Sequence, residues 1–359
     1  MPRRFTQAIR AAEALGAVVA AAILAILFLP RLTGGGNAAA PAVEQQDLNV
    51  AVVPAVDSAG FFVALHEGLF AAHGLKVTFI PAVSSETVIN AQALDAPLDR
   101  VDISCGNYVS YIQAQENYDK GERSSSASDT TVAADLDIFA EGSLMEAGAQ
   151  GLYVLPGSRV RTLAGLEGKT IGVNAPGNIL YLLAASVLAD NGLSVSGVHF
   201  AYYPLPQMAA MLKAGKITAA VLPEPFASLA EQSMGVTLLA DLDQGATTAF
   251  PVQGCAVTRQ WAGLHPVTLT AFRAAFEQGQ QIADTNRSAV ERAMEALPAP
   301  LGVSRVTAAL MALDSYPVGP VDAVRIQRVA DVMRQFLGFP AFNAMSMISG
   351  YPAASRTDR

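Results

Sequence analysis

The chain has 359 residues, a formal net charge of −8, a hydrophobic fraction of 52% and a charged fraction of 15%. This length allows two domains with ample core, and this composition is typical of a folded rather than a disordered protein. An acidic chain without a basic stripe argues against nucleic acid and anionic lipid as partners.

The first 42 residues differ from the rest. Arg3, Arg4 and Arg10 precede an apolar run, Leu15 to Leu29, and small residues follow in "GGGNAAAPA". This order is typical of a signal peptide, with cleavage expected after Ala42. An uncleaved N-terminal anchor is the alternative. Either form predicts an exported body, periplasmic or on the extracellular face of the membrane, tethered by the N-terminal helix in the second case.

Strand and helix patterns alternate along the next hundred residues. The expected order is a strand at Leu48–Val53, a helix from Phe61 to Phe70 with a stop at Gly74, a strand at Leu75–Ile80, a helix at Val88–Leu94, a strand at Val101–Cys105, a polar loop at Asp119–Asp135 and a strand at Leu136–Glu141. Such alternation predicts an α/β fold with a parallel, doubly wound sheet.

A second alternating unit begins after Gly151. The segments expected there are the strand "GLYVL", a short helix and strand in "LAGLEGKTIGVN", the helix "NILYLLAASVLADNG", the strand "VHFAYY", the helix "QMAAMLKAG" and the strand and turn "AAVLPEP". A further strand lies within Thr247–Gln260, and the pattern is then helical to about Phe336. We therefore expect a second lobe whose chain returns to the first through two hinge strands, near Gly151 and Pro251.

The expected boundaries follow from this order. Residues 1–42 are the signal peptide or anchor, 43–150 and 251–345 form lobe 1, 151–250 form lobe 2, and 346–359 are a tail.

Five polar turns follow predicted strands, where open α/β sheets bind ligands. They are Asp57-Ser58-Ala59-Gly60, Ser84-Ser85-Glu86, Gly106-Asn107-Tyr108, Asn174-Ala175-Pro176-Gly177-Asn178 and Pro223-Glu224-Pro225. Phe61 and Tyr108 are aromatic candidates for the same cleft. Each turn also has a structural interpretation, in which serine and asparagine cap helices, Asp57 and the glycines only form turns, and the aromatic rings belong to the core.

Catalytic and metal-binding patterns are lacking in the sequence. The four histidines are scattered, the two cysteines form no metal motif, and neither a nucleophile elbow nor a phosphate-binding loop occurs. We therefore expect no cofactor, no metal and no enzymatic activity. Cys105 and Cys255 form a disulfide in one interpretation and remain buried free thiols in the other.

Several segments together resemble a known family. "GFFVALHEGLFAAHGLKVTFIPA", "VDISCGN", "LAGLEGKTIGVNAPGN" and "MLKAGKITAAVLPEPFASLAEQ" occur in the order seen in substrate-binding proteins of ABC importers for sulfonates, taurine, nitrate and the thiamine pyrimidine precursor. The resemblance extends from Leu48 to Leu337. It implies a two-lobed periplasmic-binding-protein fold, a monomer that closes on one small molecule and delivers it to an ABC permease.

The resemblance also implies which residues contact the ligand. The matching positions are Asp57, Ser58, Phe61, Ser84, Ser85, Gly106, Asn107, Tyr108, Asn174, Gly177, Asn178 and Glu224. None of the five turns carries Lys or Arg, in contrast to the strong anion recognition expected of sulfonate and nitrate binders. Related enzymes that make the thiamine pyrimidine, and sensor lobes with the same fold, are the alternatives.

Charge adds an expectation about the ligand. Glu224 and Asp57 each follow a buried strand, and a buried carboxylate needs a partner. A ligand with an amine or N–H donors supplies that partner more simply than a bare anion does. In the alternative interpretation, Glu224 caps a neighbouring helix or pairs with a distant arginine.

Overall fold

The computed structural model of the chain describes residues 42–82, 101–122 and 133–349. The described residues from Val43 onward belong to one compact unit. The predicted signal peptide or anchor, Ser84 and Ser85, the expected helix at Val88–Leu94 and the tail beyond residue 349 lie outside the described residues.

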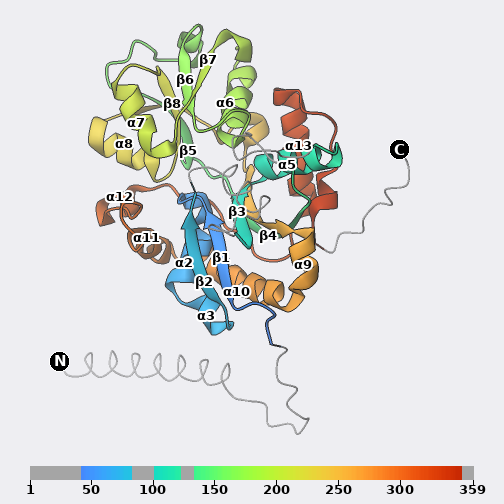
Figure 1. The fold of residues 1–359 in the computed structure, drawn as a ribbon. Helices are drawn as coiled ribbons and strands as arrows, with labels where there is room; N and C mark the ends of the chain where they lie inside the picture. Colours follow the sequence, from blue (N-terminus) through green and yellow to red (C-terminus); the bar gives the residue numbers. More distant parts are fainter. Residues whose placement is uncertain (1–41, 83–100, 123–132, 350–359) are drawn as a thin grey trace, which may run out of the picture. The chain divides into compact units, whose positions relative to one another are not determined.

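Ten described strands form two five-stranded sheets (Figure 1). The first sheet has the order β2-β1-β3-β10-β4, and the second has the order β7-β6-β8-β5-β9. The strand bounds are β1 Asp47–Val52, β2 Lys76–Pro81, β3 Ile103–Asn107, β4 Leu136–Leu144, β5 Gln150–Val154, β6 Thr170–Val173, β7 His199–Tyr202, β8 Ala219–Pro223, β9 Thr237–Asp241 and β10 Pro251–Thr258.

Both sheets are mixed, whereas the sequence pattern predicted parallel sheets. β10 runs antiparallel between β3 and β4, and β5 runs antiparallel between β8 and β9. Each of these strands is entered directly from the other sheet, β5 after β4 and β10 after β9. A helical crossover within one sheet is what makes neighbouring strands parallel, and neither strand follows one.

Helices cover the sheets as Figure 1 shows. The α-helices are α2 Ala59–His66, α3 Leu69–Ala72, α5 Tyr108–Asp119, α6 Ile179–Asp190, α7 Leu205–Lys213, α8 Phe226–Met234, α9 Arg259–Leu264, α10 Pro266–Thr285, α11 Arg287–Glu295, α12 Arg305–Leu310 and α13 Ala323–Leu337. Short 3₁₀ turns occur at η1 Val56–Ser58, η2 Leu163–Leu166, η3 Val195–Gly197, η4 Gly245–Thr247 and η5 Ala344–Met347. The single helix expected from Phe61 to Phe70 is divided at Gly68, whose φ of 72° is left-handed.

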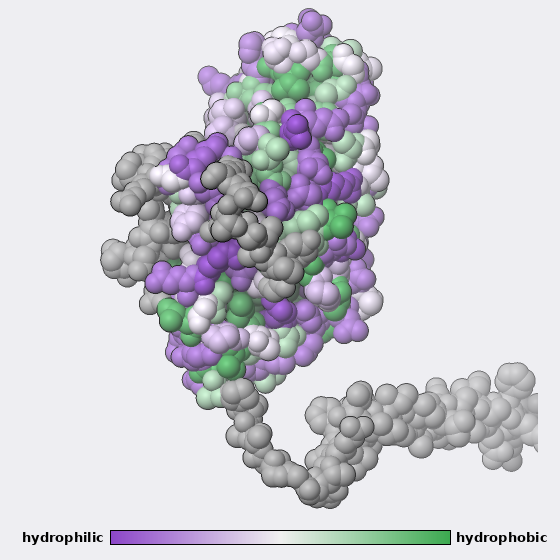
Figure 2. Space-filling model, turned by 90° about the vertical axis from the view of Figure 1, so that its right-hand side faces the viewer, coloured by the Kyte–Doolittle hydropathy of each residue, from purple (hydrophilic) through white to green (hydrophobic). Residues whose placement is uncertain are grey.

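One hydrophobic cluster joins the two sheets. It contains buried residues of α5, α6 and α13 together with residues of β4, β5, β6, β8 and β10. α13 packs its apolar face into this cluster through Ile326, Val329 and Met333. Figure 2 views the side on which Figure 1 draws α5, α9 and α13, and hydrophilic residues cover much of the coloured surface there. The sheets therefore share a core, in addition to the clusters that belong to each.

The disulfide that the sequence left open is formed. Cys105 and Cys255 lie directly opposite each other on β3 and β10, with their Cα atoms 4.1 Å apart, and both side chains are buried. The bond closes a loop of 150 residues, a separation at which a crosslink strongly restricts the unfolded chain. It holds together two strands whose ends carry polar residues, Asn107 and Gln253.

Candidate functional site

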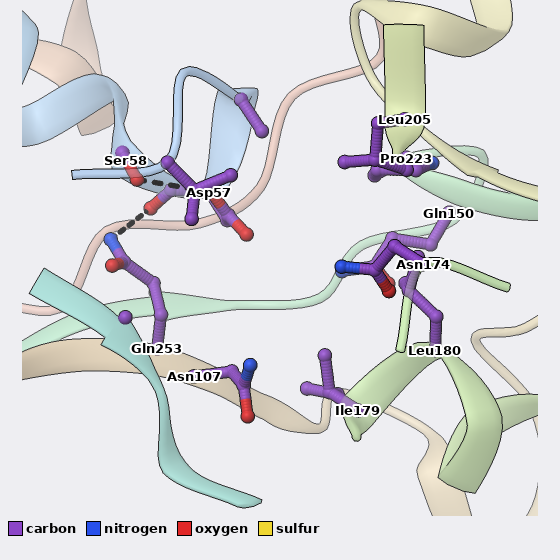
Figure 3. A pocket seen from close by; sticks show the side chains of 13 residues that line it. Asp57, Ser58, Asn107, Gln150, Asn174, Ile179, Leu180, Leu205, Pro223 and Gln253 are labelled. Carbon is purple, nitrogen blue, oxygen red and sulfur yellow. Dashed lines mark hydrogen bonds between the residues drawn. The ribbon is translucent and has the colours of Figure 1, made fainter. Parts of the chain in front are cut away.

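Strand ends from both sheets converge on one cavity (Figure 3). The cavity has about 430 Å³ of atom-free space and is partly open to solvent. Its lining residues are Val53, Ala55, Asp57, Ser58, Gly106, Asn107, Gln150, Asn174, Ile179, Leu180, Leu205, Pro223 and Gln253.

The mixed sheets explain why so many polar groups meet here. β3 ends at Asn107, and the antiparallel β10 pairs Gln253 with that residue. β8 ends at Pro223, and the antiparallel β5 pairs Gln150 with it. Each antiparallel strand therefore begins at the edge where its parallel neighbour ends. Figure 3 shows Asp57, Ser58, Asn107 and Gln253 on one side of the cavity and Gln150, Asn174, Leu180, Leu205 and Pro223 on the other.

The turn after β1 presents Asp57 to the cavity. Three hydrogen bonds hold this turn. The Ser58 hydroxyl donates to Asp57 Oδ1 at 3.1 Å, Gln253 Nε2 donates to the Asp57 carbonyl at 2.5 Å, and the Tyr316 hydroxyl donates to the Val56 carbonyl at 2.8 Å. Since Gln253 and Tyr316 come from distant parts of the chain, the position of Asp57 depends on the tertiary fold rather than on the turn sequence alone.

Burial changes the acidity of this carboxyl group. It raises the pKa of Asp57 from 3.8 to about 6, and the hydrogen bonds to Ser58 oppose the change. A second buried carboxyl, that of Asp314, has its pKa raised well above its ordinary value, first by burial and then by the negative charge of Asp57. No ion pair joins either group to a residue in the described ranges.

Two asparagines contribute amides from opposite sides. Asn107 caps α5, with its Oδ1 accepting from the Ser110 amide at 2.8 Å, and its side chain also borders the cavity. Asn178 caps α6 by accepting from the Tyr181 amide at 3.2 Å, and its Nδ2 donates to Asn174 Oδ1 at 2.5 Å. This bond turns the Asn174 amide nitrogen toward the Asp57 side of the cavity (Figure 3).

The structure places five of the predicted residues on the cavity wall, namely Asp57, Ser58, Gly106, Asn107 and Asn174. Phe61 instead lies fully buried among Phe62 and Phe70, and Tyr108 is fully buried at the start of α5. Gly177 has a left-handed φ of 65°, and its carbonyl accepts from Gln113 Nε2 at 2.8 Å. Asn178 is not among the lining residues, but its side chain donates to Asn174, which is.

Glu224 has protein partners for its carboxylate. The Ser228 amide and hydroxyl donate to it at 3.1 and 2.8 Å, and the Ala312 amide donates at 3.4 Å. Burial raises its pKa, and the bonds to Ser228 oppose this. The structure thus shows the alternative interpretation, in which the carboxylate caps the helix after it. Because Glu224 already has partners, its charge gives no reason to expect a cationic ligand group at this position. Its carbonyl accepts from the Val56 amide at 3.0 Å.

Gln150 and Gln253 were missed by the sequence reasoning, which considered only turns after parallel strands. Both side chains are 2% exposed, and the Oε1 atom of each has no hydrogen-bond partner among the described residues. The available signal was a glutamine at the start of one apolar strand and within another, where a buried amide needs a partner.

Metal-binding clusters and membrane-spanning helices are both absent from the described part of the chain. No three His, Cys, Asp or Glu side chains there are grouped so that they could hold a metal ion. Within the same ranges, no helix combines the length and apolarity needed to cross a membrane.

Solved structures with the same fold come from proteins of several functions. The alkanesulfonate-binding protein SsuA from Xanthomonas axonopodis pv. citri, bound to MOPS, has a TM-score of 0.67 at 19% identity, over 86% of this chain and 99% of that one. The periplasmic nitrate-binding protein NrtA from Synechocystis PCC 6803 has a TM-score of 0.67 at 15% identity, over 88% of this chain and 84% of that one. The desulfurization enzyme DSZB has a TM-score of 0.60 at 15% identity, over 84% and 95%. The chain has the periplasmic-binding-protein fold that such structures define.

Sequence comparison gives the family. No curated protein sequence matches the chain significantly. The model of the NMT1-like family matches residues 41–297, which is more than half of the chain. The chain therefore belongs to the NMT1-like family.

Proposed function

We propose that this protein is an exported solute-binding protein that captures a small organic molecule between its two sheets and delivers it to an ABC-type permease. The observation that carries the proposal is the cavity, which is lined from both sheets by amides, one carboxylate and apolar side chains. Ligand pockets combine an apolar wall with a few convergent polar groups in this way.

The related proteins support this function. Two of the structural neighbours are named as binding proteins, one for alkanesulfonates and one for nitrate. Export rests on the basic, apolar and small-residue pattern of residues 1–42. The division into lobes at about residues 150 and 250, and the action of the connecting segments as a hinge, belong to the same proposal, and we expect a monomer.

Catalysis on the same fold is the alternative, because one neighbour is an enzyme. Among the described lining residues, Ser58 carries the only hydroxyl, and it has neither histidine nor lysine beside it on the wall. The base within hydrogen-bond reach of this hydroxyl is the Asp57 carboxyl group, 3.1 Å away, and the serine–histidine pair of hydrolases is absent from the described wall. We therefore propose binding without chemical conversion.

A thermal-shift screen of the full chain tests the proposal. The compounds are sulfonates, taurine, nitrate, pyrimidines and small amines, and a ligand should raise the melting temperature progressively with its concentration. Mass spectrometry of the recovered compound should show it unchanged, whereas a converted product would favour the enzyme.

A matched pair of variants locates the binding site. Asn174 lines the cavity, whereas Asn191 lies after α6 and donates to the Val187 carbonyl at 2.8 Å. Asn174→Ala should weaken binding about 5- to 10-fold through the loss of one hydrogen bond, and Asn191→Ala should leave the affinity unchanged. Equal affinity in both variants would exclude this cavity as the site.

A further inference from the structure

Among the described residues that line the cavity, one side chain can carry negative charge and none carries positive charge. Asp57 is the ionisable side chain on the described wall, and the other polar groups there are amides and the Ser58 hydroxyl. Burial and then the charges of Asp57 and Glu146 raise the pKa of Asp314, and burial and then the charges of Asp314, Asp57 and Asp284 raise the pKa of Tyr316, so the neighbouring titratable groups are acids as well. A bare anion would therefore meet repulsion and find no cationic partner on this wall.

Asp57 also has unused capacity to accept hydrogen bonds. Its Oδ1 accepts from the Ser58 hydroxyl, and no described residue donates a side-chain hydrogen bond to its Oδ2. Asp57 is half-buried, and a molecule that displaces water from its carboxylate must supply charge and hydrogen-bond compensation in return. The protein supplies little of either at this position.

Two residues that line the same cavity, Gln150 and Gln253, each have a side-chain acceptor without a hydrogen-bond donor in the described part of the chain. The Oε1 atoms of Gln150 and Gln253 are buried and without partners among the described residues, and these glutamines come from different sheets. Both atoms are closed off from the cavity surface, so a ligand donor reaches them only when the side-chain amides rotate. A molecule rich in N–H groups matches this wall, whereas sulfonate and nitrate groups carry acceptors alone.

We propose, resting on the proposed function, that the captured molecule carries a protonated nitrogen, as in an amine or an amidine, and that this group forms an ion pair with Asp57. Molecules that have an anionic group and no basic nitrogen are rejected. An anionic group elsewhere on an amine is compatible with the site, provided that the nitrogen faces Asp57.

The pH dependence follows from the ion pair. The pKa of Asp57 in the free protein is about 6, so its side chain is neutral at pH 5 and ionised at pH 7.5. Only the ionised form attracts a cation. Binding should therefore tighten as the pH rises through 6, and binding near pH 6 should release a proton to the buffer.

Retention of metabolites by the full chain tests the proposal while the ligand is still unidentified. The wild type, Asp57→Asn and Asp47→Asn are incubated with a polar metabolite extract of cells, and retained molecules are identified by mass spectrometry after release. Asp47 is a matched control, because it lies at the exposed start of β1 and pairs with Lys76. The affinity of each retained molecule is then measured by calorimetry between pH 5 and 8.

The expected result is retention of a molecule with a basic nitrogen by the wild type and by Asp47→Asn. Asp57→Asn should bind it about 10- to 100-fold more weakly and without the rise in affinity through pH 6. Retention of an anion without basic nitrogen, or equal affinity in Asp57→Asn, would overturn this inference and leave the proposed function standing. A wild type that retains nothing would overturn the proposed function, and the inference with it.

Discussion

The position of Asp57 lowers the stability of the ligand-free protein when its carboxyl group is ionised. Because burial raises its pKa from 3.8 to about 6, the stability associated with its protonated form is fully present below pH 3.8 and is lost as the pH rises through 6. Asp57→Asn keeps the shape and removes the charge. We expect this variant to raise the free energy of unfolding at pH 7.5 by about 1–2 kcal/mol, allowing for the partial exposure of the side chain.

Urea denaturation of the ligand-free protein at pH 7.5 and pH 4 measures this effect. At pH 4 the difference between Asp57→Asn and the wild type should shrink, since the aspartic acid is then largely protonated. Asp47→Asn, at an exposed site, should change little at either pH. A loss of stability in Asp57→Asn of the same size at both pH values would show that the residue is structural.

The sequence predicted some residues of the cavity and missed others. The positions of Asp57, Asn107 and Asn174 at the cavity follow from the rule that ligands bind at the ends of parallel strands. The same rule selected Glu224, because a turn position does not reveal that a serine four residues later will donate hydrogen bonds to the carboxylate. It could not select Gln150 or Gln253, since their place depends on strand direction, which local patterns do not encode.

At the scale of elements, the packing of α2 on α10 sets the position of the Asp57 turn. α2 begins at Ala59, two residues after Asp57, and Gly279 of α10 lies against it. A Cβ atom at Gly279 would lie 2.6 Å from the Ala64 Cβ and 2.9 Å from the Ala64 nitrogen, and closer still to the Gly60 carbonyl oxygen. Most of these contacts are with backbone, which cannot turn away.

We therefore expect Gly279→Ala to lower the free energy of unfolding by about 1–3 kcal/mol, because the two helices must separate. Gly263→Ala in α9 is the matched control, since a Cβ there meets nothing within 4 Å. At that exposed position alanine should be neutral or slightly stabilising. Chemical denaturation of the two variants measures the difference, and equal stability would contradict the close packing described here.

The sequence predicted most of the helices and strands. For α6, the apolar stretch is preceded by Asn178, which caps the helix, and is followed by Gly192, which has a left-handed φ. Apolar periodicity predicts a helix and its buried face, but it does not name the surface against which that face packs. α13 illustrates the limit. Its pattern gives the buried face, and the structure shows that this face contributes to a cluster that includes both sheets.

At the scale of the whole molecule, polar contacts and a common core connect the two sheets around the cavity. The Val56 amide, in the turn after β1, donates to the carbonyl of Glu224, directly after β8, at 3.0 Å. Gln113 of α5 donates to the Gly177 carbonyl before α6. A ligand that contacts both sheets should favour the arrangement in which these bonds are made, by its higher affinity for that arrangement.

Hydrogen–deuterium exchange at Val56 tests this coupling. In the ligand-free protein the bond to Glu224 should open transiently as the sheets separate, so that a peptide covering Ala55–Ser58 takes up deuterium quickly. The ligand should slow this uptake, because exchange requires the open form that the ligand disfavours. A peptide centred on Val50 is the internal control, since β1 is paired with β2 and β3 on both sides. Equal protection of Val56 with and without ligand would mean that the molecule binds without closing, and the hinge would then have no role in capture.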